Sequence, residues 1–336
     1  MNDIQTQART PRKKPLLKAV IWMGATGFAL CFLVVCGASI WIWGSVDSYN
    51  RLSAPPCPSG ISPPAEAKIA FASSHNSKTT YSDIFIINAD GSKQTQLTHS
   101  SDLMDAGEPI WSKDGEKLFF YSYPNYEFWV MNADGSDLTS IPKPNVYYNL
   151  SPDEKQKVFV ENDDIYLMNA DGSGQNKLTS HASDRVNVAP AWSPDGTKIA
   201  FLLYYPAGSE DLHPSYNHLF TIRPDGTGLI DINNSAISFS WSPDGSRIAV
   251  VSIDREIYVM HSDGSHPMRI TNSSSYIVDG PNTITWSPDG EWLAFQASNS
   301  NHNSSIIITK STCSGSPWWI PDTSYSHEPD WQPAQK

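Results

Sequence analysis

Side chains that can bind a cation or exchange a proton recur a few residues ahead of a repeated tryptophan. They are carboxylates, amides and one imidazole: Asp105, Glu108, Asn145, Asn187, Asp279, Asn282, His327 and Glu328. If the fold gathers them at one mouth of a channel, this polar collar could hold a metal ion, a peptide terminus or water. No Asp-x-Asp-x-Asp-Gly run with a distal Glu occurs, which excludes an EF-hand calcium loop. We expect a ligand-binding collar with no resident metal.

The sequence offers no constellation that demands catalysis. A Gly-x-Ser-x-Gly elbow is absent, and the nine histidines are scattered along the chain. His213 and His218 share one long loop, but a histidine-ligated lyase or lactonase needs several such groups within a few ångströms. We predict no catalytic residue and no cofactor. The alternative function is a metal-assisted hydrolase or lyase that acts on a sugar or lactone in the channel.

The tryptophans that follow these polar residues belong to a repeated phrase. Trp-Ser-Pro-Asp-Gly occupies residues 192–196, 241–245 and 286–290, with a near copy at 111–115. A worn copy begins at Leu150 and a truncated one at Trp331, so that successive openings lie 39 to 49 residues apart. An alternating apolar run follows each full copy, as strands require. This period is typical of a small antiparallel sheet repeated radially.

The two ends of the repeat region complement each other. Residues 68–71 have the sequence of a second strand with no tryptophan phrase before them, and residues 328–333 have that of a first strand with nothing after them. The last strand can therefore complete the first sheet, which removes two exposed sheet edges. We predict an all-β, six-bladed β-propeller of four-stranded antiparallel blades, closed by the C-terminal strand.

These repeats resemble those of the TolB-like six-bladed propellers, relatives of the WD-repeat propellers that occur in bacterial envelope and secreted proteins. The resemblance covers residues 67–334 and is carried by Trp-Ser-Pro-Asp-Gly, Ile-Ala-Phe and Asn-Ala-Asp-Gly phrases. It implies the fold but not the partner, because an apolar segment replaces the family's extra N-terminal α/β domain. Three features depart from the pattern: Leu150 for Trp, Glu154 for Gly, and residues 309–315 for the Asn-Ala-Asp-Gly turn.

The N-terminal part predicts a membrane anchor. Residues 1–18 carry a net charge of +4 and precede 25 residues, 19–43, whose only ionisable groups are two thiols. That length suffices to span a bilayer, and the basic tail predicts a cytoplasmic N-terminus with the propeller outside. The alternatives are a signal peptide cut after Ala38 and a lipoprotein cut before Cys36. The Pro- and Ser-rich residues 44–66 predict a stalk.

The predicted binding surface is the face that carries the long loops. Strand reversal places the second-to-third loops and the connections between blades on one face, and long loops on a rigid scaffold commonly bind partners. Six tyrosines on these loops form a candidate patch: Tyr121, Tyr123, Tyr126, Tyr204, Tyr205 and Tyr216. The chain after residue 18 carries a net charge of −16, which argues against nucleic acid. We predict a non-enzymatic protein-binding or scaffolding module whose partner is a protein or a cell-envelope component.

Cys57 and Cys313 are the cysteines that lie outside the predicted span. In an oxidising compartment they could form one disulfide, and the alternative is two free, buried thiols.

Overall fold

The computed structural model describes residues 52–74, 81–99, 105–142, 149–180, 186–204, 217–233, 235–272, 276–279, 284–299, 303–315, 317–321, 323 and 325–334. The chain divides into two compact units, Met1–Ser48 and Tyr49–Lys336. The predicted span 19–43 lies outside the described residues. Within the described ranges, no helix has the length and apolar character that crossing a bilayer requires.

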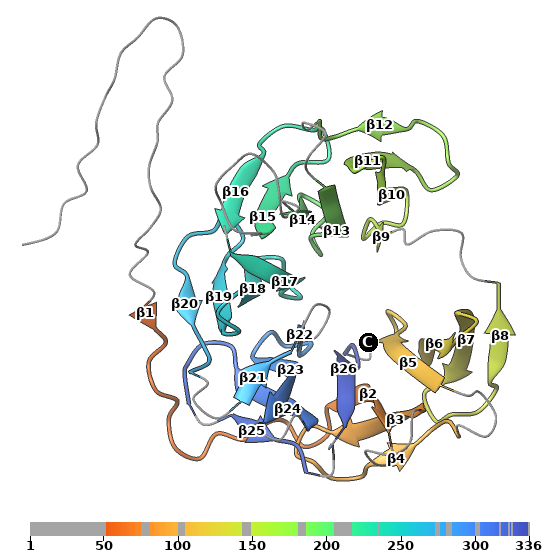
Figure 1. Cartoon of the computed structure of the whole chain (residues 1–336), viewed down its shortest axis with the longest axis vertical. Coiled ribbons are helices and arrows are strands. Elements are labelled where there is room, and N and C mark those ends of the chain that lie inside the picture. Colours follow the sequence, from red (N-terminus) through yellow and green to blue (C-terminus); the bar gives the residue numbers. More distant parts are fainter. Residues whose placement is uncertain are drawn as a thin grey trace, which may run out of the picture. The chain divides into compact units, whose positions relative to one another are not determined.

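The second unit consists of β-sheets arranged around a common centre (Figure 1). Blade 1 consists of β26 (Ser326–Trp331), β2 (Lys68–Ser74), β3 (Ser82–Asn88) and β4 (Thr95–Gln96). Blade 2 consists of β5 (Asp105–Trp111), β6 (Lys117–Tyr123), β7 (Glu127–Asn132) and β8 (Thr139–Ile141). Blade 3 consists of β9 (Asn149–Leu150), β10 (Gln156–Glu161), β11 (Asp164–Asn169) and β12 (Asn176–Lys177).

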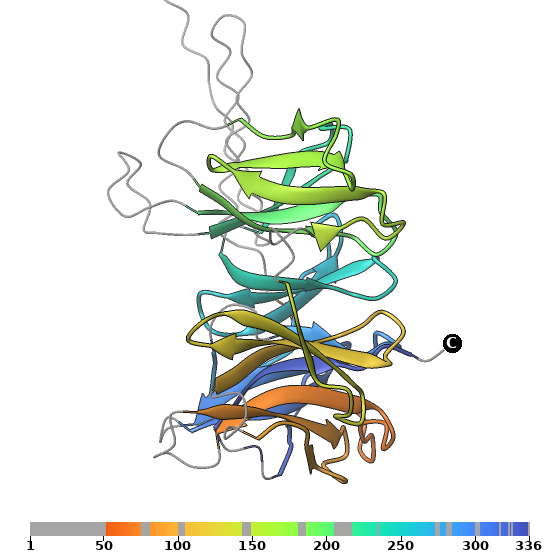
Figure 2. The ribbon, with the colours of Figure 1, turned by 90° about the vertical axis from the view of Figure 1, so that its right-hand side faces the viewer.

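The other three blades follow the same order from the centre outwards. Blade 4 consists of β13 (Val186–Trp192), β14 (Ile199–Tyr204), β15 (Asn217–Ile222) and β16 (Ile230–Asn233). Blade 5 consists of β17 (Ala236–Trp241), β18 (Arg247–Ser252), β19 (Ile257–His261) and β20 (Met268–Arg269). Blade 6 consists of β21 (Tyr276–Val278) with β22 (Ile284–Trp286), then β23 (Trp292–Asn299), β24 (Ser304–Lys310) and β25 (Trp318–Trp319). The predicted all-β, six-bladed propeller is confirmed. Figure 2 shows the blades edge-on.

The C-terminal strand closes the first blade as predicted. β26 pairs with β2 in antiparallel register, from Ile69 opposite Trp331 to Ser73 opposite Ser326. The four strands of blade 1 therefore come from both ends of the propeller sequence, and the sheet edges that each end would otherwise expose are paired.

The aspartates of the tight turns have a structural role. In the turn after Trp111, Asp114 Oδ1 accepts hydrogen bonds from Ser112 Oγ at 2.6 Å and from Glu116 N at 3.0 Å. These two bonds hold the pKa of Asp114 below its ordinary value. In the Asn-Ala-Asp-Gly turn, the hydrogen bonds that Ser136 donates lower the pKa of Asp134 in the same way. The repeated aspartates thus shape turns, as predicted.

Three of the repeat tryptophans are hydrogen-bonded to the blade before their own. The indole N–H of Trp111 donates to Asp330 O, that of Trp241 to Ala191 O, and that of Trp286 to Ser240 O, at 3.0 to 3.3 Å. Each acceptor lies in the preceding blade, one residue before that blade's own repeat tryptophan. Buried apolar clusters surround these contacts. The predicted packing role of the tryptophans is confirmed.

The N-terminal segment lies on the outer edges of blades 5 and 6. β1 (Leu52–Ser53) pairs in parallel with β20, and Ala54 is buried in the cluster between these blades. Cys57 and Cys313 form a disulfide in the structure. The described part of the predicted stalk, residues 52–66, therefore begins against the domain. A stalk would extend away from the propeller, whereas residues 52–53 are paired with its outer edge. They pair there because β20 would otherwise leave backbone N–H and C=O groups unpaired.

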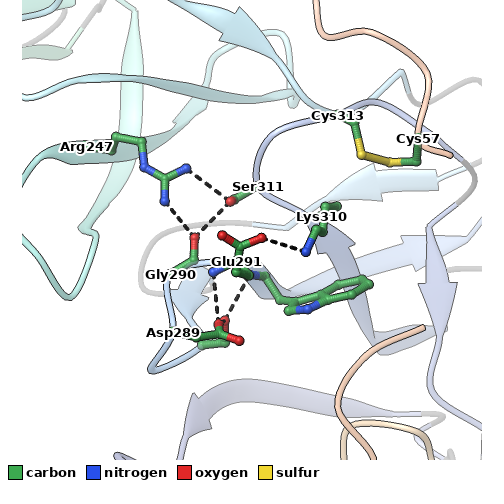
Figure 3. Close-up of polar contacts among 10 residues, drawn as sticks. Cys57, Arg247, Asp289, Gly290, Glu291, Lys310, Ser311 and Cys313 are labelled. Atoms are coloured by element: carbon green, nitrogen blue, oxygen red, sulfur yellow. Dashed lines mark hydrogen bonds and ion pairs between the residues drawn. A yellow bond between two sulfur atoms is a disulfide. The ribbon is translucent and has the colours of Figure 1, made fainter. Parts of the chain in front are cut away.

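The departure at residues 309–315 supplies contacts that hold blades 5 and 6 together on the tight-turn face (Figure 3). Arg247 donates to Gly290 O at 2.7 Å and to Ser311 Oγ at 3.2 Å, and its guanidinium lies over the Trp286 ring. Lys310 pairs with Glu291 at 2.7 Å. The disulfide lies two residues beyond Ser311, so this altered turn ties the N-terminal segment, blade 5 and blade 6 together.

Candidate functional site

The inner strands of blades 1, 2 and 4 share an irregularity just ahead of the tryptophan. Glu328, Glu108 and Ala189 each adopt positive φ angles of 52 to 56° at a register shift in the strand pairing. Each precedes a proline. A β-bulge of this kind re-aims side chains, and left-handed backbone at a residue other than glycine is unfavourable and clusters at functional sites. The bulges of blades 1 and 2 therefore mark a candidate site.

The two bulges place Glu108 and Glu328 beside each other. Glu108 N donates to Glu328 Oε2 at 2.7 Å, and the hydroxyl of Tyr123, at the end of β6, donates to Glu108 Oε1 at 2.6 Å. Gly107 makes this approach possible, because a Cβ at that position would lie 3.2 Å from the Tyr123 ring and 3.3 Å from Glu328 Oε2. Two carboxylates from separate blades are thus fixed at the inner mouth.

The network continues from Glu328 towards the start of β3. His327 Nδ1 lies 3.2 Å from Glu328 Oε2, and His327 Nε2 lies 3.2 Å from Ser82 Oγ. Ser82 N donates to Asp105 Oδ1 at 2.7 Å. Asp105, Ser82, His327 and Glu328 therefore form a continuous chain of polar contacts across blades 1 and 2. This chain, with Glu108, Tyr123 and the adjacent Tyr126, is called the acidic mouth below.

The electrostatics of the acidic mouth follow from partial burial and paired hydrogen bonds. Burial alone would raise the pKa of Glu328, but the hydrogen bond and charge of His327, with the N–H of Glu108, outweigh it and lower that pKa. Burial, and then the Glu108 carboxylate, raise the pKa of Tyr123 above its ordinary range. At neutral pH, Glu328 is therefore ionised and Tyr123 keeps the proton that it donates to Glu108.

Asp330 lies two residues after Glu328 and links three blades. Its Oδ2 accepts from Trp111 N at 2.9 Å, and its Oδ1 lies 3.3 Å from Thr285 Oγ1 of blade 6. Burial raises the pKa of Asp330 to about 6, because these hydrogen bonds only partly offset the desolvation of its charge. Asp330 titrates near the physiological range as a result.

The structure brings together half of the predicted collar. Asp105, Glu108, His327 and Glu328 meet in the acidic mouth. Tyr123 and Tyr126 join them, with ring centroids 4.9 Å apart. Asp279 instead accepts hydrogen bonds from Ser298 and Gln296 within blade 6. Tyr204 ends β14 in blade 4 and is exposed. Tyr121, predicted on a loop, lies in β6 and is buried. The other predicted positions lie outside the described residues: Asn145, Asn282, Tyr205 and Tyr216. Of Asn187 only the backbone is described.

Two residues of this region were absent from the predicted collar. Ser82 begins a third strand and not a first strand, and Asp330 belongs to the closing strand itself. A signal for Asp330 exists in the repeat: the residue before the tryptophan is neutral in the other full copies, as Ile110, Ala191, Ser240 and Thr285. A single carboxylate at that position marks a special role.

Carboxylates and an imidazole suggest metal binding by their chemistry, but their arrangement is different. In the part of the chain that the structure describes, no group of three or more His, Cys, Asp or Glu side chains is placed to hold a metal ion. The carboxylates and the imidazole of the acidic mouth are spread along β5 and β26, and the carboxylates face backbone N–H, hydroxyl and imidazole partners.

The sheets form a six-bladed β-propeller, and the inner strands of blades 1 and 2 carry the acidic mouth. The TolB beta propeller domain matches residues 163–335, about half of the sequence. The chain belongs to this family, as its repeats predicted.

One relative is similar in sequence, and two solved structures share the fold. The TolB homolog of Chlorobium luteolum is 28% identical over 134 residues, which are 38% of this chain and 30% of that protein. The crystal structure of TolB from Acinetobacter baumannii aligns with a TM-score of 0.54 at 17% identity, over 80% of this chain and 67% of that one. An oligogalacturonate lyase in complex with manganese aligns at 0.52 and 13%, over 72% and 85%. The chain matches less than half the length of these curated relatives.

Proposed function

We propose that the propeller is a non-enzymatic binding module whose acidic mouth captures a positively charged segment of a protein partner. Residues 19–43 anchor it as a single-pass protein, with the N-terminus in the cytoplasm and the propeller on the outer side of the membrane. The observation that carries this proposal is the hydrogen-bonded array of Glu108, Glu328 and Asp105 beside two tyrosines.

The charge of the acidic mouth supports a cationic ligand. Three half-buried carboxylates lie near a single imidazole, which pairs with Glu328 alone among them, so the acidic mouth contains more acidic than basic groups. A lysine or arginine side chain, or an amino terminus, would complement it. The Tyr126 ring, half exposed beside Tyr123, adds a surface for cation–π and apolar contact.

The rigidity of the acidic mouth supports binding without large ordering cost. Its side chains lie on strands and bulges of the inner sheets, and their mutual hydrogen bonds fix their directions. A partner therefore meets a preorganised surface, which saves the free energy of ordering flexible side chains.

The test places a photo-crosslinking amino acid at Tyr126 in the full chain in its native membranes. We expect a defined crosslinked partner, and Glu108→Gln with Glu328→Gln should lower its yield at least about tenfold, since both charges are lost while the acceptors remain. The same amino acid at Thr139, on the outer edge of blade 2, is the control. An undiminished yield in the double variant would contradict the proposal.

The fold shared with a manganese-bound lyase favours one alternative, a metal-assisted lyase or hydrolase that acts on a sugar or lactone. Equilibrating the full chain with manganese and measuring bound metal separates the two. Stoichiometric manganese that is lost in His327→Gln would favour the alternative, and a metal-free protein that keeps its crosslink favours the binding module.

A further inference from the structure

The outer edge of the propeller differs between its two halves. β25 of blade 6 presents Trp318 and Trp319, 41% and 39% exposed. In blade 4, Leu229, just before β16, and Ile230, its first residue, are both nearly half exposed. The outer strands of blades 1 to 3 are mainly polar: Thr95–Gln96, Thr139–Ile141 and Asn176–Lys177. Leu138, just before β8, is the one large apolar residue exposed beside them among the described residues, at 36%. Blade 5, between blades 4 and 6, ends in β20 and β1, where Arg269 donates to Ser53 Oγ at 3.2 Å. The exposed apolar residues on the outer strands of blades 4 and 6 are called the apolar rim.

The tryptophan pair of the apolar rim is held in an exposed position. Pro317 and Pro321 flank the pair in the sequence, and Tyr276 packs edge-on against Trp319 with ring centroids 5.9 Å apart. Adjacent exposed tryptophans on a soluble surface usually mark an interaction site. An indole has a large apolar body and one N–H group, which suits the boundary between lipid tails and water.

The chain outside the described residues indicates what lies beside this rim. The first described strand, β1, is the outermost strand of blade 5 and so lies between the outer edges of blades 4 and 6 (Figure 1). The predicted span ends at Trp43, and only residues 44–51 separate it from β1. Eight residues reach at most about 30 Å when extended. With residues 19–43 in the bilayer, as proposed above, β1 therefore lies within this reach of the bilayer surface.

We propose that the apolar rim rests on the lipid bilayer, with Trp318 and Trp319 in its interfacial region. This inference relies on the anchor of the proposed function. The propeller then stands on its edge, so that the acidic mouth opens parallel to the membrane and stays accessible to a partner. The net charge of −16 after residue 18 opposes attraction to anionic lipid, so apolar insertion drives the contact and salt should change it little.

The test uses the full-length chain in phosphatidylcholine vesicles with brominated acyl chains, which quench tryptophan emission at the interface. The emission of the double variant Trp318→Phe/Trp319→Phe is subtracted from that of the native chain. The difference is the emission of this pair, because all other tryptophans contribute equally to both spectra. We expect bromolipid to lower the emission of the pair about twofold, and aqueous iodide to have little effect. The matched control is Trp129→Phe, in β7 of blade 2, whose difference emission should not respond to bromolipid.

Each outcome decides the inference. If iodide quenches the emission of the pair and bromolipid does not, the inference is overturned. It is also overturned if neither quencher acts on the pair, which would indicate contact between copies of the chain. Extraction with alkaline carbonate tests the anchor separately. A chain that resists extraction but shows no bromolipid quenching keeps its anchor and loses the proposed rim contact.

Discussion

Two junctions of the ring differ sharply in how they are held. Where the closing strand enters, buried apolar clusters lie on both sides, between blades 6 and 1 and between blades 1 and 2, and Asp330 links all three blades. Between blades 2 and 3, the described residues form no buried apolar cluster. There, Lys113 donates to Pro152 O at 3.0 Å and lies 3.9 Å from Glu154.

The repeat sequence explains the difference. Leu150 replaces the tryptophan that would pack on the preceding blade, and it is 46% exposed. Seven residues later, Lys157 occupies the position at which Ile199 and its counterparts are buried against the preceding blade. On the facing side, Phe119 stands where other blades have the small residues Ala70 or Ala200, and it is only half buried. The junction that joins the two chain ends is therefore stronger than one within the continuous chain.

The largest expected effect comes from the matched pair Trp331→Ala and Leu150→Ala, which truncate the same repeat position at the two junctions. Trp331 is 3% exposed, so its truncation should lower the free energy of unfolding by about 4 kcal/mol. Leu150→Ala should cost less than about 1 kcal/mol because the side chain is half exposed. Denaturant unfolding measures both, and equal losses would contradict the comparison.

The second prediction concerns the charge at the closing junction. Burial raises the folded pKa of Asp330 to about 6 from an ordinary value of 3.8. Stability from its protonation is therefore fully present below about pH 3.8 and is lost as the pH rises through about 6.

Asp330→Asn should remove this dependence. Between pH 7 and pH 5 the native chain should gain about 1 kcal/mol relative to the variant, measured as the difference in their unfolding free energies. Glu328→Gln provides the opposite sign, because the pKa of Glu328 is lowered and its stabilisation disappears as the pH falls. Parallel pH profiles of Asp330→Asn and the native chain would sink this prediction.

Restoring the missing indole should strengthen the weak junction. In Leu150→Trp, the new N–H would face the carbonyl of Ile110, by analogy with Trp111 and Asp330 O. We expect a gain of about 1 kcal/mol, seen as a rise of a few degrees in the melting temperature. Leu150→Phe adds a ring without a donor and should give less. A loss of stability in both variants would show that the junction has no room for a ring.

The smallest effect should come from the polar contacts of the weak junction. Lys113 and Glu154 are both largely exposed, so Lys113→Met should change the unfolding free energy by no more than about 0.5 kcal/mol. Lys155→Met, whose lysine pairs with Asp153 inside its own turn, is the control. A loss above about 2 kcal/mol for Lys113→Met alone would mean that this contact holds the two blades together.

The sequence predicts the features that repeat. Six blades, the closing strand, the tryptophan packing and the turn aspartates follow from local phrases such as Trp-Ser-Pro-Asp-Gly, each of which carries its own turn and strand signals. The meeting of Asp105, Glu108 and His327 follows from their common place ahead of the tryptophans.

The features that do not repeat required the structure. The pairing of Glu108 N with Glu328 depends on two bulges whose register shifts no periodicity reveals. β1 contains two residues within a proline-rich segment, too few for an alternating pattern, and it forms only because β20 has a free edge. The departure at Leu150 was visible, but its effect on a junction depends equally on Phe119, which lies 31 residues earlier.

The disulfide and β1 also determine where mechanical load would enter the domain. A pull on the N-terminal segment meets β1 first, then the covalent link to Cys313, whereas β2 of the closing sheet begins 11 residues after Cys57. Tension is therefore transferred to blade 6 through a covalent bond before it can peel β2 away from β26. A force applied at the N-terminal end of the propeller therefore leaves the pairing of β2 with β26 in place.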